Sequence, residues 1–393
     1  MFIVSNSFAQ WVQNYWTTAH ISSVYFYDSL TGYATLFSGE ILKTTDAGNT
    51  WTLISTIAND NTLQEIFFTS PDTGYAVGIS GVIIKTTNGG LNWNYQNSNT
   101  NEYLQSVYFT DKNTGYVTGD GGTILKTVDA GANWIPQTSG TTDWLISVKF
   151  TDSNNGYIAG GYGTYGRILK TTNGGVDWSI TPGISTELLH SVFFVDEQTG
   201  YAVGNYGTLL KTTNAGVDWQ TLTFSSNYHL TSVWFTDANT GYVVGNSSNG
   251  VIFKTIDGGA TWAQQLNEGY GLNAVCFINA SIGCAVGGYT ILRTSNAGET
   301  FIDENAGEHF FSVHPNPTSD NITINILNTD DEFIECTIHN VIGSLIKSVP
   351  LINTAPYKTI SFNIDLASIS NGVYMVSVKT KKLNHTQKIL IHR

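Results

Sequence analysis

Short apolar runs separated by turn residues recur along the first three quarters of the chain. One unit reads, in order, as the runs Ser191–Phe194, Gly200–Gly204 and Thr208–Thr212, followed by a fourth run that begins at Trp219. Each run is too short for a helix and is bounded by turn-forming residues, which is typical of β-strands. The pattern therefore predicts units of four strands, which we name a to d in chain order.

The unit recurs seven times at intervals of 41 to 44 residues. A basic residue near the end of strand c is followed eight residues later by Trp, or once by Phe. Four strands in about 42 residues match one propeller blade, so the sequence predicts an all-β fold with a seven-bladed β-propeller. The basic and aromatic residues of the seven units are Lys43/Trp51, Lys85/Trp93, Lys126/Trp134, Lys170/Trp178, Lys211/Trp219, Lys254/Trp262 and Arg293/Phe301.

Two turns in each unit carry residues suited to hydrogen bonding. The a–b turn has Asp four residues before Gly, as in Asp196 and Gly200, with Ser70 or Asn279 replacing Asp in two units. The c–d turn follows the pattern Thr-x-Asp/Asn-x-Gly-x-x-Trp, as in residues 44–51. Short oxygen-bearing side chains accept hydrogen bonds from backbone N–H groups within a turn, so we expect these residues to be architectural.

The c–d turn resembles the Asp-box, or BNR repeat, of sialidases and related propellers. The whole unit, with TGYAVG at 199–204 and ILKTTNGG at 168–175, resembles the photosystem II stability and assembly factor family. The resemblance covers roughly residues 11–301 and implies a propeller that binds protein and has no catalytic site. We do not extend the photosystem partner of that family to this chain.

The N-terminal segment offers a way to close the ring. Trp11 is an additional copy of the strand-d Trp, placed before the first unit. We expect it to begin an outer strand that pairs with strand c of the last unit, at Ile291–Thr294.

The repeat stops near His309, and alternating strands follow at Ile322–Ile326, Cys336–Asn340 and Val373–Val378. About seven short strands in roughly 80 residues predict a small immunoglobulin-like β-sandwich. The predicted organisation is a signal-peptide remnant at 1–10, the propeller at 11–304, a linker at 305–310 and the C-terminal domain at 311–393.

Several C-terminal motifs, in order, resemble the type A C-terminal sorting domain of the type IX secretion system of Bacteroidetes-like bacteria. The resemblance implies export to the outer-membrane surface or the medium of a Gram-negative bacterium, with the secretion machinery as a partner. Ser7, Phe8 and Ala9 resemble the end of a signal peptide. The residues that carry the sorting motif are Pro315, Asn316, Pro317, Gly343, Gly372, Tyr374 and Lys388.

Charge narrows the choice of partner. The net charge of −13 comes from the propeller, because residues 1–308 hold ten basic and twenty-four acidic residues. Most of the basic residues occupy the repeated position, so no cationic patch for nucleic acid is expected. No apolar run is long enough for a membrane helix. We also expect the protein to be a monomer.

Catalysis has weak support in the residues. The sialidase resemblance would require three arginines around one site, whereas the chain has only Arg167, Arg293 and Arg393. A glycoside hydrolase that uses rim carboxylates remains the alternative. The acids outside the repeat that could serve it are Glu40, Asp120, Asp143, Glu187 and Glu268.

Cofactor and metal sites are not expected. His20, His190 and His229 each precede strand a of a different unit, and we expect them to lie apart. Cys276 and Cys284 fall on neighbouring strands, and a disulfide between them stays an open alternative to two buried thiols.

The d–a and b–c loops leave the blades on the face opposite the Asp-boxes, and they are rich in aromatic residues. Exposed aromatic rings are typical of protein and sugar contacts, so this face predicts non-catalytic recognition of a protein or glycan. Trp16, Tyr103 and Tyr289 lie in the same loops. The predicted ligand-binding residues are Trp144, Tyr162, Tyr165, Tyr206, Tyr228 and Tyr270.

Overall fold

The chain divides into two compact units in a computed structural model, one containing residues 11–298 and the other the described residues from 311 onward. Within the described residues the only helical elements are single 3₁₀ turns, η1 (Ile79–Gly81), η2 (Asp120–Gly122) and η3 (Asn205–Gly207). None of them has the length or the hydropathy needed to cross a membrane. The structure describes residues 11–57, 62–185, 187–224, 227–247, 249–298, 311–314, 318, 321–327, 333–340, 344–350, 359–380 and 384–391.

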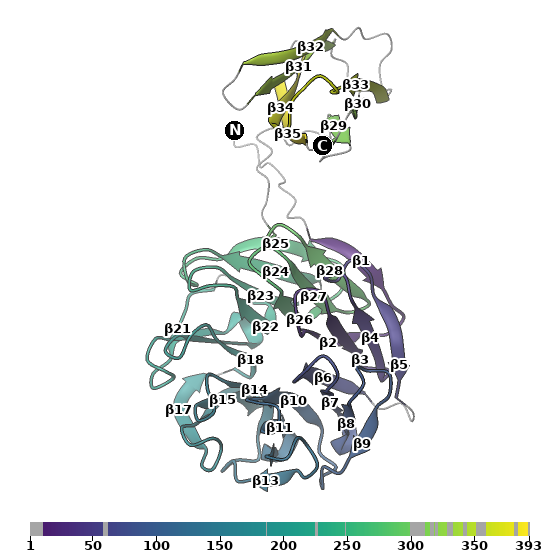
Figure 1. Cartoon of the computed structure of the whole chain (residues 1–393). Helices are drawn as coiled ribbons and strands as arrows, with labels where there is room; N and C mark the ends of the chain where they lie inside the picture. Colours follow the sequence, from purple (N-terminus) through teal and green to yellow (C-terminus); the bar gives the residue numbers. More distant parts are fainter. Residues whose placement is uncertain are drawn as a thin grey trace. The chain divides into compact units, whose positions relative to one another are not determined.

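Seven four-stranded antiparallel sheets make up the described part of the large unit, arranged around a common centre (Figure 1). This confirms the predicted all-β propeller. Blades 1 to 3 are β2 (Ile21–Phe26), β3 (Gly32–Leu36), β4 (Glu40–Thr44), β5 (Thr52–Thr56); β6 (Leu63–Phe68), β7 (Gly74–Gly78), β8 (Ile83–Thr86), β9 (Asn94–Gln96); and β10 (Leu104–Phe109), β11 (Gly115–Gly119), β12 (Ile124–Thr127), β13 (Ile135–Gln137).

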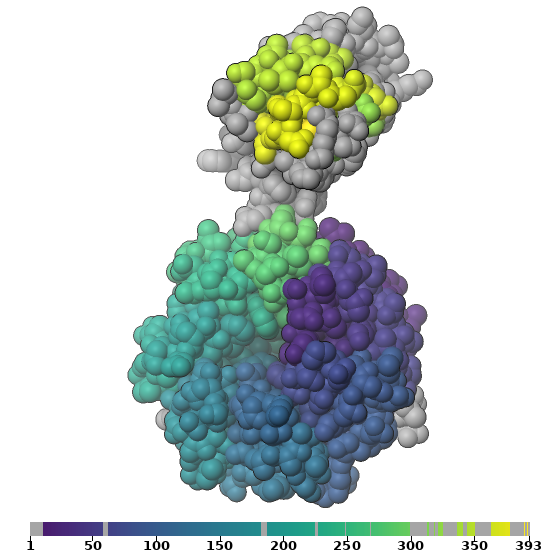
Figure 2. Space-filling model, viewed as in Figure 1, coloured from purple at the N-terminus to yellow at the C-terminus, as the bar shows by residue number. Residues whose placement is uncertain are grey.

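The remaining blades follow the same order, and Figure 2 shows the blades surrounding a central depression. Blades 4 to 6 are β14 (Trp144–Phe150), β15 (Gly156–Tyr162), β16 (Tyr165–Thr171), β17 (Ser179–Ser185); β18 (Leu189–Phe194), β19 (Gly200–Gly204), β20 (Leu209–Thr212), β21 (Gln220–Thr221); and β22 (His229–Phe235), β23 (Gly241–Asn246), β24 (Gly250–Thr255), β25 (Ala263–Glu268). Blade 7 has β26 (Leu272–Phe277), β27 (Gly283–Gly287) and β28 (Thr290–Thr294), with β1 (Val12–Trp16) as its outer strand.

The predicted closure of the ring is confirmed. β1 pairs antiparallel with β28, so that Val12 lies opposite Arg293 and Trp16 opposite Thr290. Trp11 is buried, and its ring lies 5.9 Å from that of Phe277 in an edge-on contact. The last blade is therefore assembled from both ends of the propeller sequence.

Each junction between interior blades repeats one set of contacts. Tyr116 of blade 3 stacks on Phe150 of blade 4 with 4.1 Å between ring centroids. Its hydroxyl donates to the Gly174 carbonyl at 2.7 Å, and Lys126 Nζ donates to the same oxygen at 2.6 Å. The repeated basic residue therefore satisfies a turn carbonyl of the next blade and is not free to contact a ligand.

The junction between blades 7 and 1 departs from this scheme. Cys284 occupies the position of the buried Tyr, directly opposite Cys276, and both are buried free thiols. Arg293 Nε donates to the Ala47 carbonyl at 2.8 Å, and Asn14 of β1 donates to the Gly48 carbonyl. This junction has no Tyr hydroxyl, and Asn14 of the outer strand provides a side-chain hydrogen bond to the turn of blade 1 in addition to that of Arg293.

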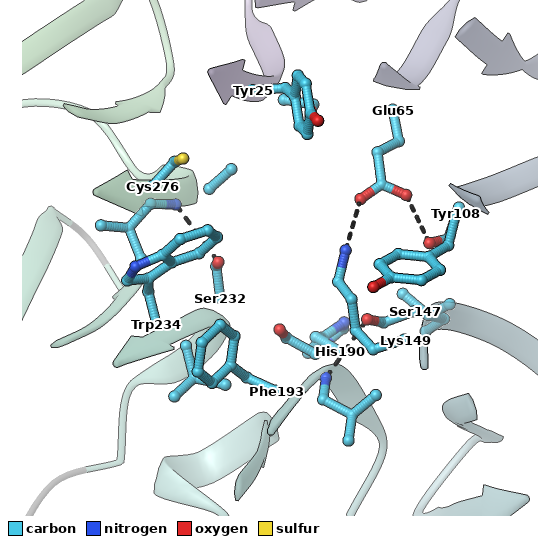
Figure 3. Close-up of a pocket in the computed structure, with 18 of the residues that line it drawn as sticks. Tyr25, Glu65, Tyr108, Ser147, Lys149, His190, Phe193, Ser232, Trp234 and Cys276 are labelled. Carbon is cyan, nitrogen blue, oxygen red and sulfur yellow. Dashed lines mark hydrogen bonds and ion pairs between the residues drawn. The ribbon is translucent and has the colours of Figure 1, made fainter. Parts of the chain in front are cut away.

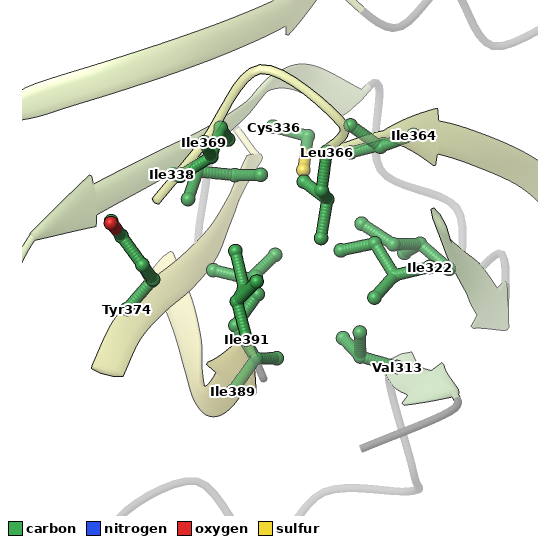
Figure 4. Packing of buried hydrophobic residues seen from close by; sticks show 12 residues of the cluster. Val313, Ile322, Cys336, Ile338, Ile364, Leu366, Ile369, Tyr374, Ile389 and Ile391 are labelled. Atoms are coloured by element: carbon green, nitrogen blue, oxygen red, sulfur yellow. The ribbon is translucent and has the colours of Figure 1, made fainter. Parts of the chain in front are cut away.

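The small unit contains two antiparallel sheets, in the orders β29-β30-β33 and β32-β31-β34-β35. Apolar side chains from both sheets, including Val313, Ile322, Ile338 and Ile389, form one core (Figure 4). The strands are β29 (Phe311–His314), β30 (Asn321–Leu327), β31 (Phe333–Asn340), β32 (Leu345–Pro350), β33 (Thr359–Asp365), β34 (Gly372–Thr380) and β35 (Asn384–Ile391).

Three of the predicted sorting residues lie within the described residues. Gly372 begins β34, Tyr374 is buried and donates its hydroxyl to the Ser370 carbonyl at 3.0 Å, and Lys388 of β35 pairs with Met375. Pro315, Asn316, Pro317 and Gly343 lie outside the described residues.

Candidate functional site: the central channel and its loop rim

A cavity of about 1140 Å³ occupies the centre of the propeller (Figure 3). The first strand of every blade contributes to its wall. Because strand a begins at a d–a loop and ends at an a–b turn, its first residues lie at the loop-rich mouth and its last residues lie towards the Asp-box face. Some positions of these seven strands carry the same type of residue in most blades, and others differ from blade to blade.

A β-bulge interrupts strand a near its start in all seven described blades, one residue after the pairing begins in five of them and two residues after it in blades 4 and 6. The bulged residue has no partner in the register and lines the channel near its mouth. Bulges redirect a side chain and are common beside functional sites. The bulge residues vary and are mostly polar: Ser22, Gln64, Gln105, Ile146, His190, Thr231 and Asn273.

Deeper in the channel, the residue three positions after the bulge is aromatic in five blades. These half-buried rings pack against their neighbours, with centroid distances of 4.9 Å for Tyr25–Phe67, 5.3 Å for Phe67–Tyr108 and 5.1 Å for Phe193–Trp234. Lys149 and Cys276 occupy the same position in blades 4 and 7. We name the five rings, Tyr25, Phe67, Tyr108, Phe193 and Trp234, the aromatic collar.

Glu65 and Lys149 are two departures from the repeat that pair with each other. Lys149 Nζ lies 3.4 Å from Glu65 Oε1 and 5.5 Å from the centroid of Tyr108. Glu65 Oε2 accepts the Ser106 hydroxyl and, at 2.8 Å, the backbone N–H of Val107. The carboxylate is thus held by three donors, and the pair adds no net charge to the channel.

The rim over blade 4 is the longest hairpin on this face. Tyr162 pairs with Tyr165 at the tip, and Trp144 contacts Tyr162 edge-on at 5.3 Å. Tyr165 donates to Asp143 Oδ1 at 3.1 Å, and Asp143 also forms an ion pair with Arg167. Three predicted binding residues therefore belong to one cluster, beside a shallow pocket that Tyr165 and Arg167 help to line.

The rim over blades 5 and 6 presents Tyr206. This residue is 59% exposed and has a left-handed backbone with φ of +52°, where the corresponding turns have Ser80 and Gly121. A bulky residue rarely adopts this conformation, and such strain is often found at functional sites. Tyr206 lies 4.9 Å from the ring of His229. Tyr228, another predicted binding residue, is half-buried, and its ring lies 5.8 Å from that of Phe253.

The expectation that the three histidines lie apart is wrong for one pair. His190 Nε2 and His229 Nδ1 each lie 2.8 Å from Asn205 Oδ1. Burial lowers the pKa of His190, and this favours the neutral ring. Across the described ranges no three His, Cys, Asp or Glu side chains come close enough to hold a metal ion. Both histidines instead position Asn205 beside Tyr206.

Where blade 7 meets blade 1, five ring-bearing side chains form a row in which each ring contacts the next. Tyr270 lies 5.8 Å from Trp16 and 5.0 Å from Tyr289, and His20 lies 4.5 Å from Tyr289 and 6.4 Å from Phe37. We name these five residues the seam cluster. Tyr270 is a predicted site residue, whereas Phe37 was not predicted because no repeat pattern marks it.

The acids of the hydrolase alternative have varied surroundings. Glu40 accepts the Ser38 hydroxyl at 2.8 Å, and Asp143 is engaged by Arg167. Asp120 accepts the Gln105 side chain at 2.9 Å, and burial raises its pKa. Glu187 interacts with another residue, and the side chain of Glu268 is not among those that the structure describes.

Comparison with protein families matches each unit separately. The model described as Photosynthesis system II assembly factor YCF48 matches residues 43–141 and 136–228. The model described as Secretion system C-terminal sorting domain matches residues 312–392. A search of curated proteins found no match.

Solved structures share the fold at low sequence identity. YCF48 bound to D1 peptide has a TM-score of 0.62 and 19% identity, covering 74% of this chain and 97% of that one. PorZ, a surface component of the type IX secretion system of Porphyromonas gingivalis, has a TM-score of 0.56 and 13% identity, covering 95% and 59%. A GH74 xyloglucanase from Xanthomonas campestris has a TM-score of 0.62 and 12% identity, covering 82% and 60%.

These likenesses agree with the Asp-box turns and with the motifs at the C-terminal end. The sorting domain indicates export by type IX secretion, and therefore a secreted or cell-surface protein that meets the secretion machinery. The chain thus combines a BNR-type propeller that is similar to the photosystem II assembly factor with a type IX secretion C-terminal sorting domain.

Proposed function

We propose that this protein is an exported, non-catalytic binding propeller that recognises a protein or glycan at the cell surface through its loop rim. The observation that carries the proposal is the placement of exposed aromatic rings outside the repeated positions. Trp144 begins β14, Tyr162 ends β15 and Tyr206 lies in η3, so all three border a d–a or b–c connection, and Tyr162 is 54% exposed. Exposed Tyr and Trp are the residues that dominate binding interfaces.

The residues of the opposite face favour the same assignment. Thr127 Oγ accepts the backbone N–H of Gly131, and Asp129 accepts the backbone N–H of Asn133. Such side chains are engaged within their own turn and offer little to a ligand. The rim is therefore the better candidate for recognition.

Binding can be tested with the full chain on a glycan array and on a panel of purified surface proteins. The variant Trp144→Ala/Tyr162→Ala should lose the ligand that the unchanged protein retains, with no change in unfolding temperature. Retained affinity in this variant would reject the blade 4 rim as the contact.

Delivery to the surface can be tested by removing residues 311–393. We expect the shortened protein to accumulate in the periplasm, because the sorting domain is the part that the secretion machinery recognises. Normal surface delivery without this domain would contradict the proposal.

A secreted glycoside hydrolase is the second candidate, and the raised pKa of Asp120 is the observation that favours it. Carboxyls whose pKa is raised by burial are the type that enzymes use as general acids. Release of reducing ends from plant or host polysaccharides, lost in Asp120→Asn, would support it. Inactivity over a broad polysaccharide panel would reject it.

A further inference from the structure

The seam cluster is assembled from segments far apart in the sequence. Trp16 ends β1 and His20 precedes β2, Phe37 follows β3, and Tyr270 and Tyr289 belong to the loops around blade 7. Successive ring centroids lie 4.5 to 6.4 Å apart. Ring closure alone brings these side chains into one row.

The row is open to solvent and leads into the channel. Trp16 is 58% exposed and Tyr270 46% exposed, and Phe37 at the other end also lines the central cavity. Deeper in the same cavity lie the half-buried rings of the aromatic collar, beginning with Tyr25 (Figure 3). Exposed apolar side chains that lie next to one another are typical of binding surfaces.

Polar groups without net charge accompany these rings. The bulge residues at the channel mouth provide amide, hydroxyl and imidazole groups, among them Gln64, Gln105 and Thr231. The Glu65–Lys149 ion pair balances the two charges beside the collar. Ligand sites commonly combine apolar rings with a few polar groups that fix orientation.

Sugar rings match this chemistry. A pyranose presents an apolar C–H face that can pack on an aromatic ring, and hydroxyls that can hydrogen-bond to amide and hydroxyl side chains. An anionic polymer would be repelled by the acidic propeller, whose residues 1–308 hold twenty-four acids and ten bases.

We infer that a neutral glycan strand lies along the seam cluster and enters the mouth of the channel. The inference rests on the proposed binding function and assigns its ligand class and a contact surface beyond the blade 4 rim. The peptide backbone already links the same segments, since Thr17 N–H donates to the Tyr289 carbonyl and Ile21 N–H to that of Gly288. A glycan bound across these segments would hold β1 against blade 7 and stabilise the closed ring.

Titration calorimetry on the full chain can test this with hexasaccharides of β-linked glucose, xylose, mannose and N-acetylglucosamine. A galacturonic acid hexamer and a proline-rich peptide serve as the anionic and peptide probes. We expect at least one neutral hexamer to bind and to raise the unfolding temperature, and the anionic hexamer not to bind.

Two variants locate the contact. Trp16→Ala/Tyr289→Ala should weaken binding of the neutral hexamer about tenfold or more, as loss of ring stacking predicts. Val12→Ala, an exposed position on the same strand, is the matched control and should bind normally.

The outcomes separate the two proposals. Binding that is lost in Trp144→Ala/Tyr162→Ala but retained in the seam variant would overturn the seam contact and keep the proposed function. Binding retained in both variants would contradict both proposals. Preference for the peptide or the anionic hexamer, or no binding of any neutral hexamer, would overturn the glycan assignment.

Discussion

The two faces of the propeller are built from the same blades but from different kinds of residue. On the Asp-box face each turn repeats one set of hydrogen bonds, as Thr127 and Asp129 do in blade 3. On the loop face, the 3₁₀ turns between strands b and c of blades 2, 3 and 5 carry different residues at the same position, namely Ser80, Gly121 and Tyr206. Repetition marks the residues that hold the ring together, and departure from it marks the residues free to serve a ligand.

The largest effect on stability is expected at a repeated aromatic residue. Trp134 is buried among Tyr75 and Phe109, so Trp134→Ala should lower the free energy of unfolding by about 3–5 kcal/mol. The indole N–H of Trp134 has no hydrogen-bond partner among the described residues. Trp134→Phe should therefore cost much less, and urea unfolding of both variants checks this. Equal losses would show that the ring is not the source of stability.

A smaller effect is expected at the junction hydroxyls. Tyr116→Phe removes one donor to the Gly174 carbonyl but leaves that of Lys126. The loss in unfolding free energy should be about 1 kcal/mol or less. Tyr162→Phe on the loop face is the matched control and should be neutral. A larger loss in the control would remove the distinction between the faces.

Acid should weaken the Asp-box face specifically. Hydrogen bonds from Asn133 lower the pKa of Asp129 to about 2, and those from Thr261 do the same for Asp257. Because both carboxyls are more acidic folded than unfolded, their contribution is complete above about pH 4 and is lost as the pH falls through about 2. Melting temperatures between pH 5 and 2 should fall less steeply in Asp129→Asn. An unchanged slope would contradict this role.

The smallest effect on stability is expected at the rim. Trp144→Ala/Tyr162→Ala removes exposed rings, so its unfolding free energy should stay within about 0.5 kcal/mol of that of the unchanged protein. Chemical denaturation checks this. A loss of several kcal/mol would mean that the blade 4 cluster is structural.

The sequence predicted the elements that repeat. The spacing of Lys and Trp predicted the blades, and the extra Trp11 predicted the pairing of β1 with β28. The turn oxygens were also predicted, since Asp111 Oδ1 accepts the backbone N–H groups of Asn113 and Thr114. Each of these depends on local spacing that occurs several times, which makes the signal readable.

Contacts that depend on ring geometry were not predictable in the same way. Glu65 and Lys149 lie 84 residues apart, and only the circular arrangement of strand a brings them together. The shared contact of His190 and His229 with Asn205 has the same origin. The seam cluster depends on closure between residues near 16 and near 289, although closure itself was predicted.

The most direct test compares one substitution pair on each face. The dissociation constant of the surface ligand found with the array or protein panel would be measured for the full chain, for Trp144→Ala/Tyr162→Ala and for Val176→Ala/Val217→Ala. The two valines are 67% and 63% exposed on the Asp-box turns. We expect affinity to fall at least about tenfold in the rim variant and to be unchanged in the valine variant. Loss of affinity in the valine variant with none in the rim variant would contradict the account.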